Sequence, residues 1–200
     1  LRNGELVFAG TKQGDLKKIP GCPIAYWVGD KMRDVFQSGT PIGNLCETAV
    51  GLFTCDNERF IRLWYEVGHS SIGFSLHDRK AAQESLKRYF PYNKGGGFHK
   101  WYGLNNLIVQ FDKDGREIRE HRQDSGQSYS LPGEQHYFKE GVTWSGLTSS
   151  INSFRYSPNG YLFESNKGQM LFSNNDGVML AFLNTKVVQS FIELINPTLS

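Results

Sequence analysis

The chain has 200 residues, of which 38% are hydrophobic, and its formal net charge is +2. This length can bury one sizeable core, and a charge this small does not by itself indicate a nucleic-acid binder. The three cysteines cannot all pair within the chain and none forms a Cys-x-x-Cys arrangement, which argues against a zinc or redox motif. No apolar run approaches the roughly 20 residues of a membrane span. We expect a cytoplasmic protein that contacts no membrane.

The first 40 residues have the composition of a connector. Glu5–Gly10 alternates as a short strand does, and the segment after it holds two glycines and two prolines that interrupt regular structure. Asp30 is placed to cap a short helix that carries apolar residues on one face and ends at Gly39. Because the sequence begins with Leu1 rather than with a methionine, we expect a piece excised from a longer chain.

The segment from residue 41 to residue 175 has the texture of short strands and turns. Its β-branched and aromatic residues are interrupted by glycine, asparagine and Asp-Gly pairs. Ile61–Val67 alternates between the two faces expected of a strand. Leu107–Phe111 predicts a strand that runs into a tight turn over Asp112–Gly115.

Two segments have the pattern of helices. His77–Phe90 has helical propensity, and we expect its helix to end at Pro91. After Asp176 the chain keeps helical periodicity as far as the residue before Pro197, and this is the strongest helix that the sequence predicts. The polar segment 122–135 is expected to be a mobile loop. Together these elements predict a mixed α+β fold.

A search for catalytic motifs finds little. The sequence has no Gly-x-Ser-x-Gly elbow, no His-Glu-x-x-His zinc helix and no phosphate loop ending in Gly-Lys-Ser or Gly-Lys-Thr. Gly95–Gly97 is followed by Phe98 and His99 rather than by the start of a helix, so it lacks the context of a phosphate-binding loop. The histidines are scattered without the spacing of ligands. We therefore expect this chain to be no enzyme by itself and to hold no cofactor or metal.

One stretch has an unusual charge pattern. Ser85–Phe111 contains four lysines or arginines, seven aromatic residues and no acidic residue. Phosphates repel carboxylates, so a long acid-free span with several cations suits a surface that faces a phosphate backbone. The aromatic side chains can stack on exposed bases, or they can be core residues flanked by solvated charge. A second acid-free span, Gly141–Phe163, carries Arg155 among hydroxyl and amide side chains that can read base edges, although polar loops have the same composition.

Five blocks of the sequence resemble a known family in their order and content. They follow one another as in the C-terminal part of the adenine-specific DNA methyltransferases of BREX phage-defence systems and of related fused restriction-modification enzymes. The resemblance covers nearly the whole chain. The blocks are "IPGCPIAYWVGDKMRDVF", "GLFTCDNERFIRLWYEV", "FPYNKGGGFHKWYG", "YFKEGVTWS" and "LAFLNTKVVQSFIELINPTL".

The resemblance implies a role in DNA recognition. In that family the methyl-donor site and the Asn-Pro-Pro-Tyr-type motif lie in a catalytic domain upstream of these blocks, and neither motif is present here. This chain would then be the target recognition domain, which binds double-stranded DNA. The parent enzyme would be a site-specific adenine methyltransferase that uses S-adenosylmethionine.

The resemblance also implies a fold and a division of the chain. The fold is a twisted, mostly antiparallel sheet with irregular loops, a short N-terminal helix and a long C-terminal helix, similar to the recognition domains of type I specificity subunits. Residues 1–40 would connect to the catalytic domain, residues 41–175 would form the recognition domain, and residues 176–200 would form a C-terminal helix that the family continues.

Long cations are expected to contact phosphates, whereas amide, hydroxyl and guanidinium groups are expected to read base edges. The phosphate candidates are Arg59, Arg62, Lys94 and Lys100, and the base candidates are Asn57, Ser145, Asn152 and Arg155. Trp101 and Trp144 are expected in the core rather than on DNA.

Two other functions stay open at this point. A protein-interaction module could use the same aromatic surface to bind another defence component or a phage inhibitor, and its DNA binding would depend little on salt. A self-contained hydrolase would need a nucleophile or metal cluster that the linear sequence does not reveal.

Overall fold

The computed structural model describes residues 14, 17–25, 27–146 and 151–195, and in these residues eight strands form two four-stranded sheets. The first sheet is antiparallel throughout and has the order β1 (Cys46–Ala49), β8 (Met170–Ser173), β5 (Gly141–Trp144) and β6 (Phe154–Ser157). The second has the order β2 (Ile61–Leu63), β4 (Leu107–Gln110), β3 (Tyr89–Asn93) and β7 (Leu162–Phe163), and its β3–β7 pair is parallel. This architecture confirms the predicted α+β class with mostly antiparallel sheets.

An aromatic core holds the two sheets together. One apolar cluster combines Phe90 and Tyr92 of β3 with Met170 of β8. The ring of Phe90 meets that of Phe138 edge to face, with 5.5 Å between the ring centroids. The buried Tyr92 hydroxyl donates a hydrogen bond to the Leu52 carbonyl oxygen over 3.1 Å. The period-2 pattern of β3 therefore sends Phe90 and Tyr92 inward, as a strand between two layers requires.

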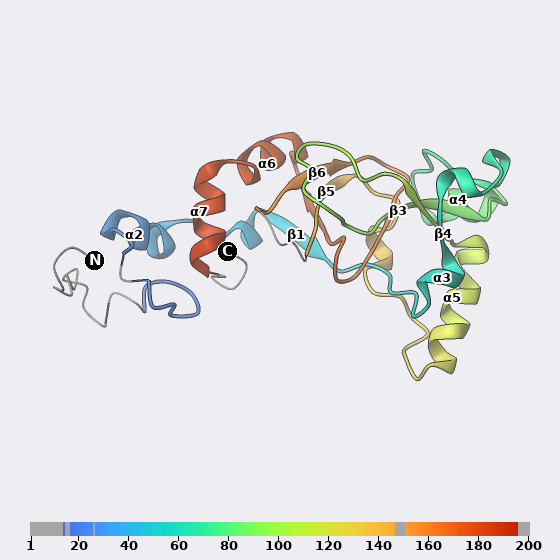
Figure 1. Cartoon of the computed structure of the whole chain (residues 1–200), viewed down its shortest axis with the longest axis horizontal. Coiled ribbons are helices and arrows are strands. Elements are labelled where there is room, and N and C mark those ends of the chain that lie inside the picture. The colour runs from blue at the N-terminus through green and yellow to red at the C-terminus, as the bar shows by residue number, and fades with distance from the viewer. Residues whose placement is uncertain (1–13, 15–16, 26, 147–150, 196–200) are drawn as a thin grey trace.

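The molecule is elongated, and helices α2 (Asp30–Ser38) and α7 (Lys186–Ile195) lie together at one end of it (Figure 1). The rings of Phe36 and Phe191 meet edge to face with 5.0 Å between their centroids. The predicted helix before Gly39 is confirmed, although Gly29 rather than Asp30 is its N-cap residue. The strand expected over residues 5–10 lies outside the described residues.

The prediction of one long C-terminal helix is wrong in one respect, because the structure has two helices there. Helix α6 (Asp176–Leu183) ends at Asn184, and α7 continues after a bend of 67°. Thr185 starts the new helix by accepting a hydrogen bond from the Val188 N–H with its hydroxyl oxygen. Across the part of the chain that the structure describes, no single helix is long and apolar enough to cross a membrane, and α6 and α7 meet those criteria only as this bent pair.

The helix expected over residues 77–90 is shorter than predicted. It is α4 (Arg79–Glu84), capped by the Asp78 carboxylate. Leu86 has a positive φ of 54° and is 91% exposed, and the chain enters β3 at Tyr89. Pro91 therefore lies inside a strand instead of ending a helix. It is tolerated there because β7 pairs only with Tyr92 and Asn93, so β3 has one ladder partner at Pro91.

The turn after β4 is confirmed, but it leads into a helix that the sequence analysis missed. Lys113, Asp114 and Gly115 have consecutive positive φ values of 52°, 61° and 68° within the element α5 (Asp112–Asp124). Asp114 also accepts from Arg119 over 3.1 Å and pairs with Arg79 of α4. These ion pairs tie α4 to α5, and α5 occupies the first residues of the segment predicted to be a loop.

The strand expected over residues 61–67 ends early. After β2 the chain turns into a 3-10 helix, η2 (Trp64–Glu66), because the Glu66 carboxylate accepts a hydrogen bond from the Leu63 N–H over 2.7 Å. The short helix α3 (Asn57–Phe60) precedes β2. The remaining 3-10 helices of the described residues are η1 (Ile42–Asn44), η3 (His69–Ser71) and η4 (Glu134–His136).

Candidate nucleic-acid interface

Three loops meet at the ends of the strands in the middle of the molecule. We call this place the loop junction and define it as residues 93–97, 144–146 and 164–168. Glycine is required at three contacts, since a Cβ atom would lie 1.9 Å from a carbonyl oxygen at Gly95 and 2.2 Å from one at Gly146 and at Gly168. The Gly96 N–H donates to the Ser145 hydroxyl oxygen over 3.1 Å. These contacts hold the three loops at fixed positions relative to one another.

The loop junction presents two lysines. Burial lowers the pKa of Lys94, while the carboxylate of Glu164 raises it and the neighbouring charge of Lys167 lowers it. Lys167 is exposed, and its N–H donates to the Glu164 carboxylate. The two ammonium groups share one buried carboxylate, Glu164, so the loop junction keeps one net positive charge that favours an anion.

Lys167 is a residue that the sequence analysis missed. It lies outside both acid-free spans, because Glu164 separates it from the second one. Its place beside Lys94 depends on the close approach of Gly95 to the Lys167 carbonyl oxygen, which no local pattern reveals. The one available signal is the Asn-Lys-Gly turn over residues 166–168.

The structure brings three of the predicted residues to one open cavity of about 230 Å³. Asn57, Arg62 and Lys94 line it together with Glu58 and Glu66. The Arg62 guanidinium is half-buried and donates to the carbonyl oxygens of Glu58 and Ile61. The Asn57 side-chain oxygen accepts from the Thr54 hydroxyl over 2.9 Å. Arg62 and Asn57 are therefore held in place, and Lys94 adds a second positive charge at this edge of the second sheet.

Two other phosphate candidates have protein partners. Arg59 is exposed but lies 3.6 Å from the Glu117 carboxylate, and its guanidinium carbon is 4.8 Å from the centroid of the Phe60 ring. The Lys100 Nζ donates to the Asn184 carbonyl oxygen over 3.2 Å, where α6 ends. A cation at the C-terminus of a helix complements the helix dipole. Lys100 thus contributes to the fold and does not join Lys94.

Arg155 is buried, with 1% of its surface exposed. Its Nη2 donates to the Ser145 hydroxyl oxygen over 3.3 Å, and its Nη1 lies 3.5 Å from the carbonyl oxygens of His99 and Ser153. Its Nε has no hydrogen-bond partner among the described residues, and burial lowers its pKa. A side chain in this position cannot reach a base edge, so the expected direct contact of Arg155 with DNA is not compatible with the fold.

The other base candidates differ in access. Ser145 is buried, and its hydroxyl oxygen accepts hydrogen bonds from both Gly96 and Arg155. Its side chain therefore connects two parts of the loop junction. Asn152 is half-buried near the start of the described segment 151–195. Trp144 packs against Phe154 as expected for a core residue. Trp101 is 53% exposed, contrary to the core position expected for it.

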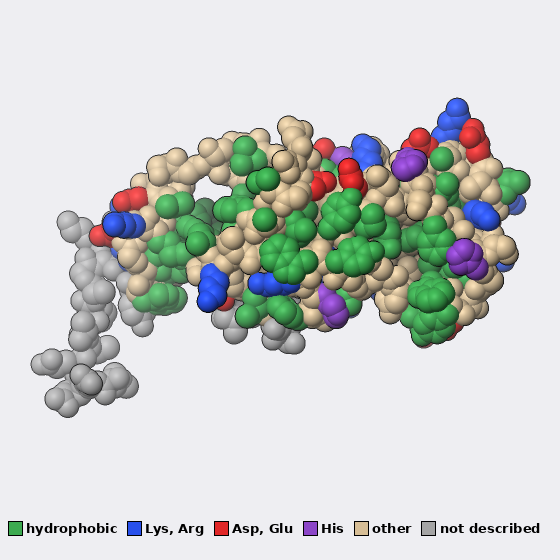
Figure 2. Space-filling model, turned by 90° about the horizontal axis from the view of Figure 1, so that it is seen from above, with side chains coloured by type: hydrophobic (Ala, Val, Ile, Leu, Met, Phe, Trp, Pro, Cys, Tyr) green, Lys and Arg blue, Asp and Glu red, His purple; other side chains and the backbone are tan. Residues whose placement is uncertain are grey.

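The aromatic residues of the acid-free stretch Ser85–Phe111 divide into two groups. The first group is in the core, and the second group is on the surface beside the cations. The buried residues are Phe90, Tyr92 and Phe111, the exposed residues are Phe98, Trp101 and Tyr102, and Tyr89 is half-buried. Figure 2 shows one face of the molecule, where apolar side chains spread along its length with lysines and arginines scattered among them. On this face the apolar and charged side chains are thus mixed, which agrees with the small net charge of the chain.

Comparison with known proteins relates the chain to methyltransferases. No protein-family model matches it. It is 37% identical over 195 residues to the adenine-specific methyltransferase PglX of Lacticaseibacillus casei (strain Zhang), and the matched region covers 94% of this chain and 16% of that protein. It is 33% identical over 205 residues to the adenine-specific methyltransferase BrxX of Escherichia coli O9:H4 (strain HS), which covers 100% of this chain and 16% of that protein. The chain is homologous to one part of these methyltransferases and spans about a sixth of their length.

Proposed function

We propose that this chain is the sequence-specific recognition domain for double-stranded DNA of an adenine-specific methyltransferase in a phage-defence or restriction-modification system. The homology to PglX and BrxX supports the methyltransferase context. The observation that carries the proposal is the loop junction, where close glycine contacts bring the loops of Lys94 and Lys167 together. A preorganised pair of cations binds phosphates without a further cost of ordering the loops.

In this proposal the candidate residues have different roles. Lys94 and Lys167 hold phosphates of the DNA backbone, and Arg62 adds positive charge at the same edge of the second sheet. Asn152 is the accessible base-reading candidate, and Asn57 is another at the rim of the cavity. Arg155 is a positioning residue, because it acts through the Ser145 hydroxyl on the loop junction.

The domain boundaries follow from the same proposal. Residues 41–175 contain both sheets and form the recognition domain, and residues 1–40 connect it to a methyltransferase domain of the same chain. Residues 176–200 form the C-terminal part, in which α7 packs on the connector. Methylation chemistry and S-adenosylmethionine belong to that other domain.

The aromatic cavity of the described residues does not fit the methyl donor. The donor carries a positive sulfonium and a ribose that carboxylates commonly hold. This cavity, which Trp64, Phe74 and Tyr161 line, has no carboxylate in its lining. The fragment by itself is therefore proposed to be catalytically inert.

The test is a titration of this chain with a short labelled duplex, followed by fluorescence anisotropy at increasing salt. DNA binding through phosphate contacts predicts that the logarithm of affinity falls linearly with the logarithm of salt concentration, with a slope near −0.9 per contact. A protein-interaction module predicts weak or absent binding with little salt dependence. That second result would overturn the proposed function.

A further inference from the structure

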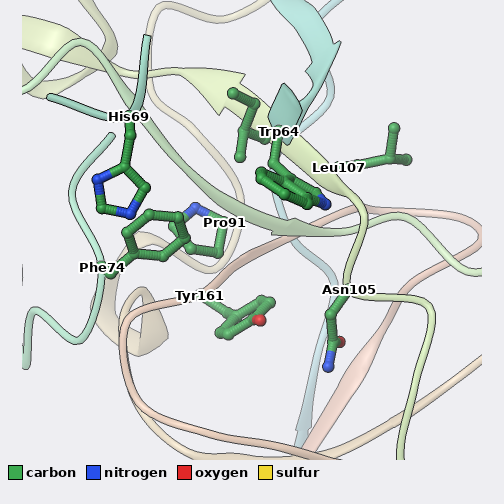
Figure 3. Close-up of a pocket in the computed structure, with 8 residues that line it drawn as sticks. Trp64, His69, Phe74, Pro91, Asn105, Leu107 and Tyr161 are labelled. Carbon is green, nitrogen blue, oxygen red and sulfur yellow. The ribbon is translucent and has the colours of Figure 1, made fainter. Parts of the chain in front are cut away.

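An aromatic pocket of about 280 Å³ opens on the face of the second sheet that points away from the core. Its floor is Pro91 and Ile108, which are directly opposed in the β3–β4 ladder. Figure 3 shows Trp64, Phe74 and Tyr161 arranged around this floor, with His69 beside Phe74. Side chains of this kind usually turn inward, so their grouping at an open cavity indicates a ligand.

A backbone hydrogen bond and close contacts fix the walls of the aromatic pocket. The backbone N–H of Trp64 donates to the Asn106 carbonyl oxygen over 3.0 Å, which fixes η2 beside the start of β4. Gly160 has a positive φ of 94°, and a Cβ there would lie 3.0 Å from the Ser75 nitrogen, so the Tyr161 wall fits closely against the Phe74 wall. The rings of His69 and Phe74 lie 5.3 Å apart between centroids. Trp64 nevertheless keeps 47% of its surface exposed.

One polar group of the pocket lacks a partner. The side-chain Nδ2 of Asn105 is buried, and no acceptor for it exists among the described residues. A buried donor without an acceptor is unfavourable, and rotation of the Asn105 side chain toward the pocket would let it donate to an acceptor at the edge of a planar ring. The pocket volume suits one ring system, because it is below the range of drug-sized sites.

The aromatic pocket favours a neutral ring, and the cavity next to it is lined by two cations, Lys94 and Arg62, together with two carboxylates, Glu58 and Glu66. No carboxylate lines the pocket. Leu107 lines both the aromatic pocket and the cavity of Lys94 and Arg62, so the two sites are neighbours across the end of β2. A nucleotide has this combination of a planar base with acceptor edges and a phosphate on a flexible backbone.

We propose that the aromatic pocket receives one nucleobase unstacked from a DNA strand whose phosphates lie along Lys94 and Arg62, an inference that rests on the DNA-binding function proposed above. The base stacks on Trp64 and Phe74, and an acceptor on its edge takes the hydrogen bond of Asn105. Such a pocket provides affinity for a distorted duplex and does not require a particular sequence.

The experiment uses this chain and three short duplexes of one sequence. The first is fully paired, the second has a single bulged 2-aminopurine nucleotide, and the third has an abasic nucleotide at the bulge. We expect the bulged base to bind about tenfold more tightly than the abasic bulge, which corresponds to the stacking of one base. The 2-aminopurine fluorescence should fall on binding. Trp64→Ala and Phe74→Ala should abolish this preference and leave the affinity for the paired duplex unchanged.

Trp27→Ala is the matched control, because Trp27 is exposed and lies beside α2 at the other end of the molecule. It should keep the preference, and Asn105→Asp should reduce it by removing the donor. Equal affinity for the base and abasic bulges, with the paired duplex still bound, would overturn the pocket inference and leave the proposed function standing. Displacement of the bulged base by a proline-rich peptide that binds wild type but not Trp64→Ala would assign the pocket to peptides instead. Failure to bind any duplex would overturn both.

Discussion

The side-chain amide of Asn184 pairs with both backbone groups of Phe154. Its Nδ2 donates to the Phe154 carbonyl oxygen over 2.9 Å, and its Oδ1 accepts from the Phe154 N–H over 3.2 Å. Asn184 is 8% exposed, and it is also the residue at which α6 ends. The break between the two C-terminal helices is thus joined to β6, the strand that carries Arg155.

Asn184→Leu should destabilise the protein by about 1–3 kcal/mol, because it leaves the Phe154 N–H without a partner and removes one of the two hydrogen bonds to the Phe154 carbonyl oxygen, which keeps the bond from the Trp101 N–H. The free energy of unfolding in urea measures this. Asn174→Leu is the control, since Asn174 is exposed in the loop before α6 and should change stability by less than about 0.5 kcal/mol. Equal effects of the two substitutions would show that the pairing with Phe154 contributes nothing.

Asn184 also shows why the sequence predicted some elements and not others. Helix α2 and the turn after β4 depend on neighbours in the chain, namely helical spacing before Gly39 and the Asp-Gly turn at Gly115. The break between α6 and α7 depends on Phe154, thirty residues away. Likewise the helical propensity before Pro91 gives way to the pairing of β3 with β4 and β7. Local sequence signals are sufficient to predict a helix or a turn only where tertiary contacts do not compete with them.

The candidate site divides in the same way. Lys94 could be selected from the acid-free stretch, and the cavity groups it with Asn57 and Arg62. Lys167 could not, because a backbone contact between distant glycine-containing loops places it. The isolation of Arg155 from acids in the sequence suggested a base reader, but the fold uses that arginine inside the protein. Burial is a property of the whole fold, and the residues around Arg155 do not reveal it.

Arg155→Met should leave the free energy of unfolding within about 1.5 kcal/mol of wild type, because methionine keeps much of the buried stem and removes a charge that no carboxylate pairs among the described residues. Arg155→Ala should cost about 2–5 kcal/mol through the cavity that it leaves. Urea denaturation of both variants checks the difference. A methionine variant as unstable as the alanine variant would show that the guanidinium hydrogen bonds, and not the packing of the stem, stabilise the loop junction.

The double substitution Lys94→Ala with Lys167→Ala should lower the affinity equally for all sequences. It should also make the slope of the logarithm of affinity against the logarithm of salt concentration shallower by roughly 2. The matched control is Lys31→Ala with Lys186→Ala, which removes the same charge from α2 and α7. That control should change the slope by much less. Anisotropy titrations over a salt series measure both, and equal slopes for the two double variants would place the loop junction away from the DNA.

The chain should show no saturable heat of binding with S-adenosylmethionine in calorimetry. The reason is that the aromatic cavity offers no carboxylate for the ribose, whereas the cavity that combines Tyr137 with Asp78 and Glu134 also contains Arg79, Lys80 and Lys139, which repel the sulfonium. Duplex DNA titrated into the same sample serves as the positive control for a folded and active chain. Saturation by the methyl donor at micromolar concentration would contradict the assignment of this chain to recognition alone.

The most direct test of sequence-specific recognition is selection from a random duplex library on this chain, followed by sequencing of the bound fraction. The account predicts one enriched motif, since hydrogen-bonding groups held at fixed positions discriminate against each wrong base pair by about 1–3 kcal/mol. Asn152→Ala should relax one position of that motif, and the Lys94 and Lys167 double variant should reduce the amount of DNA recovered without changing the motif. A bound pool that stays random, at a salt concentration where the chain still retains duplex, would contradict the central claim.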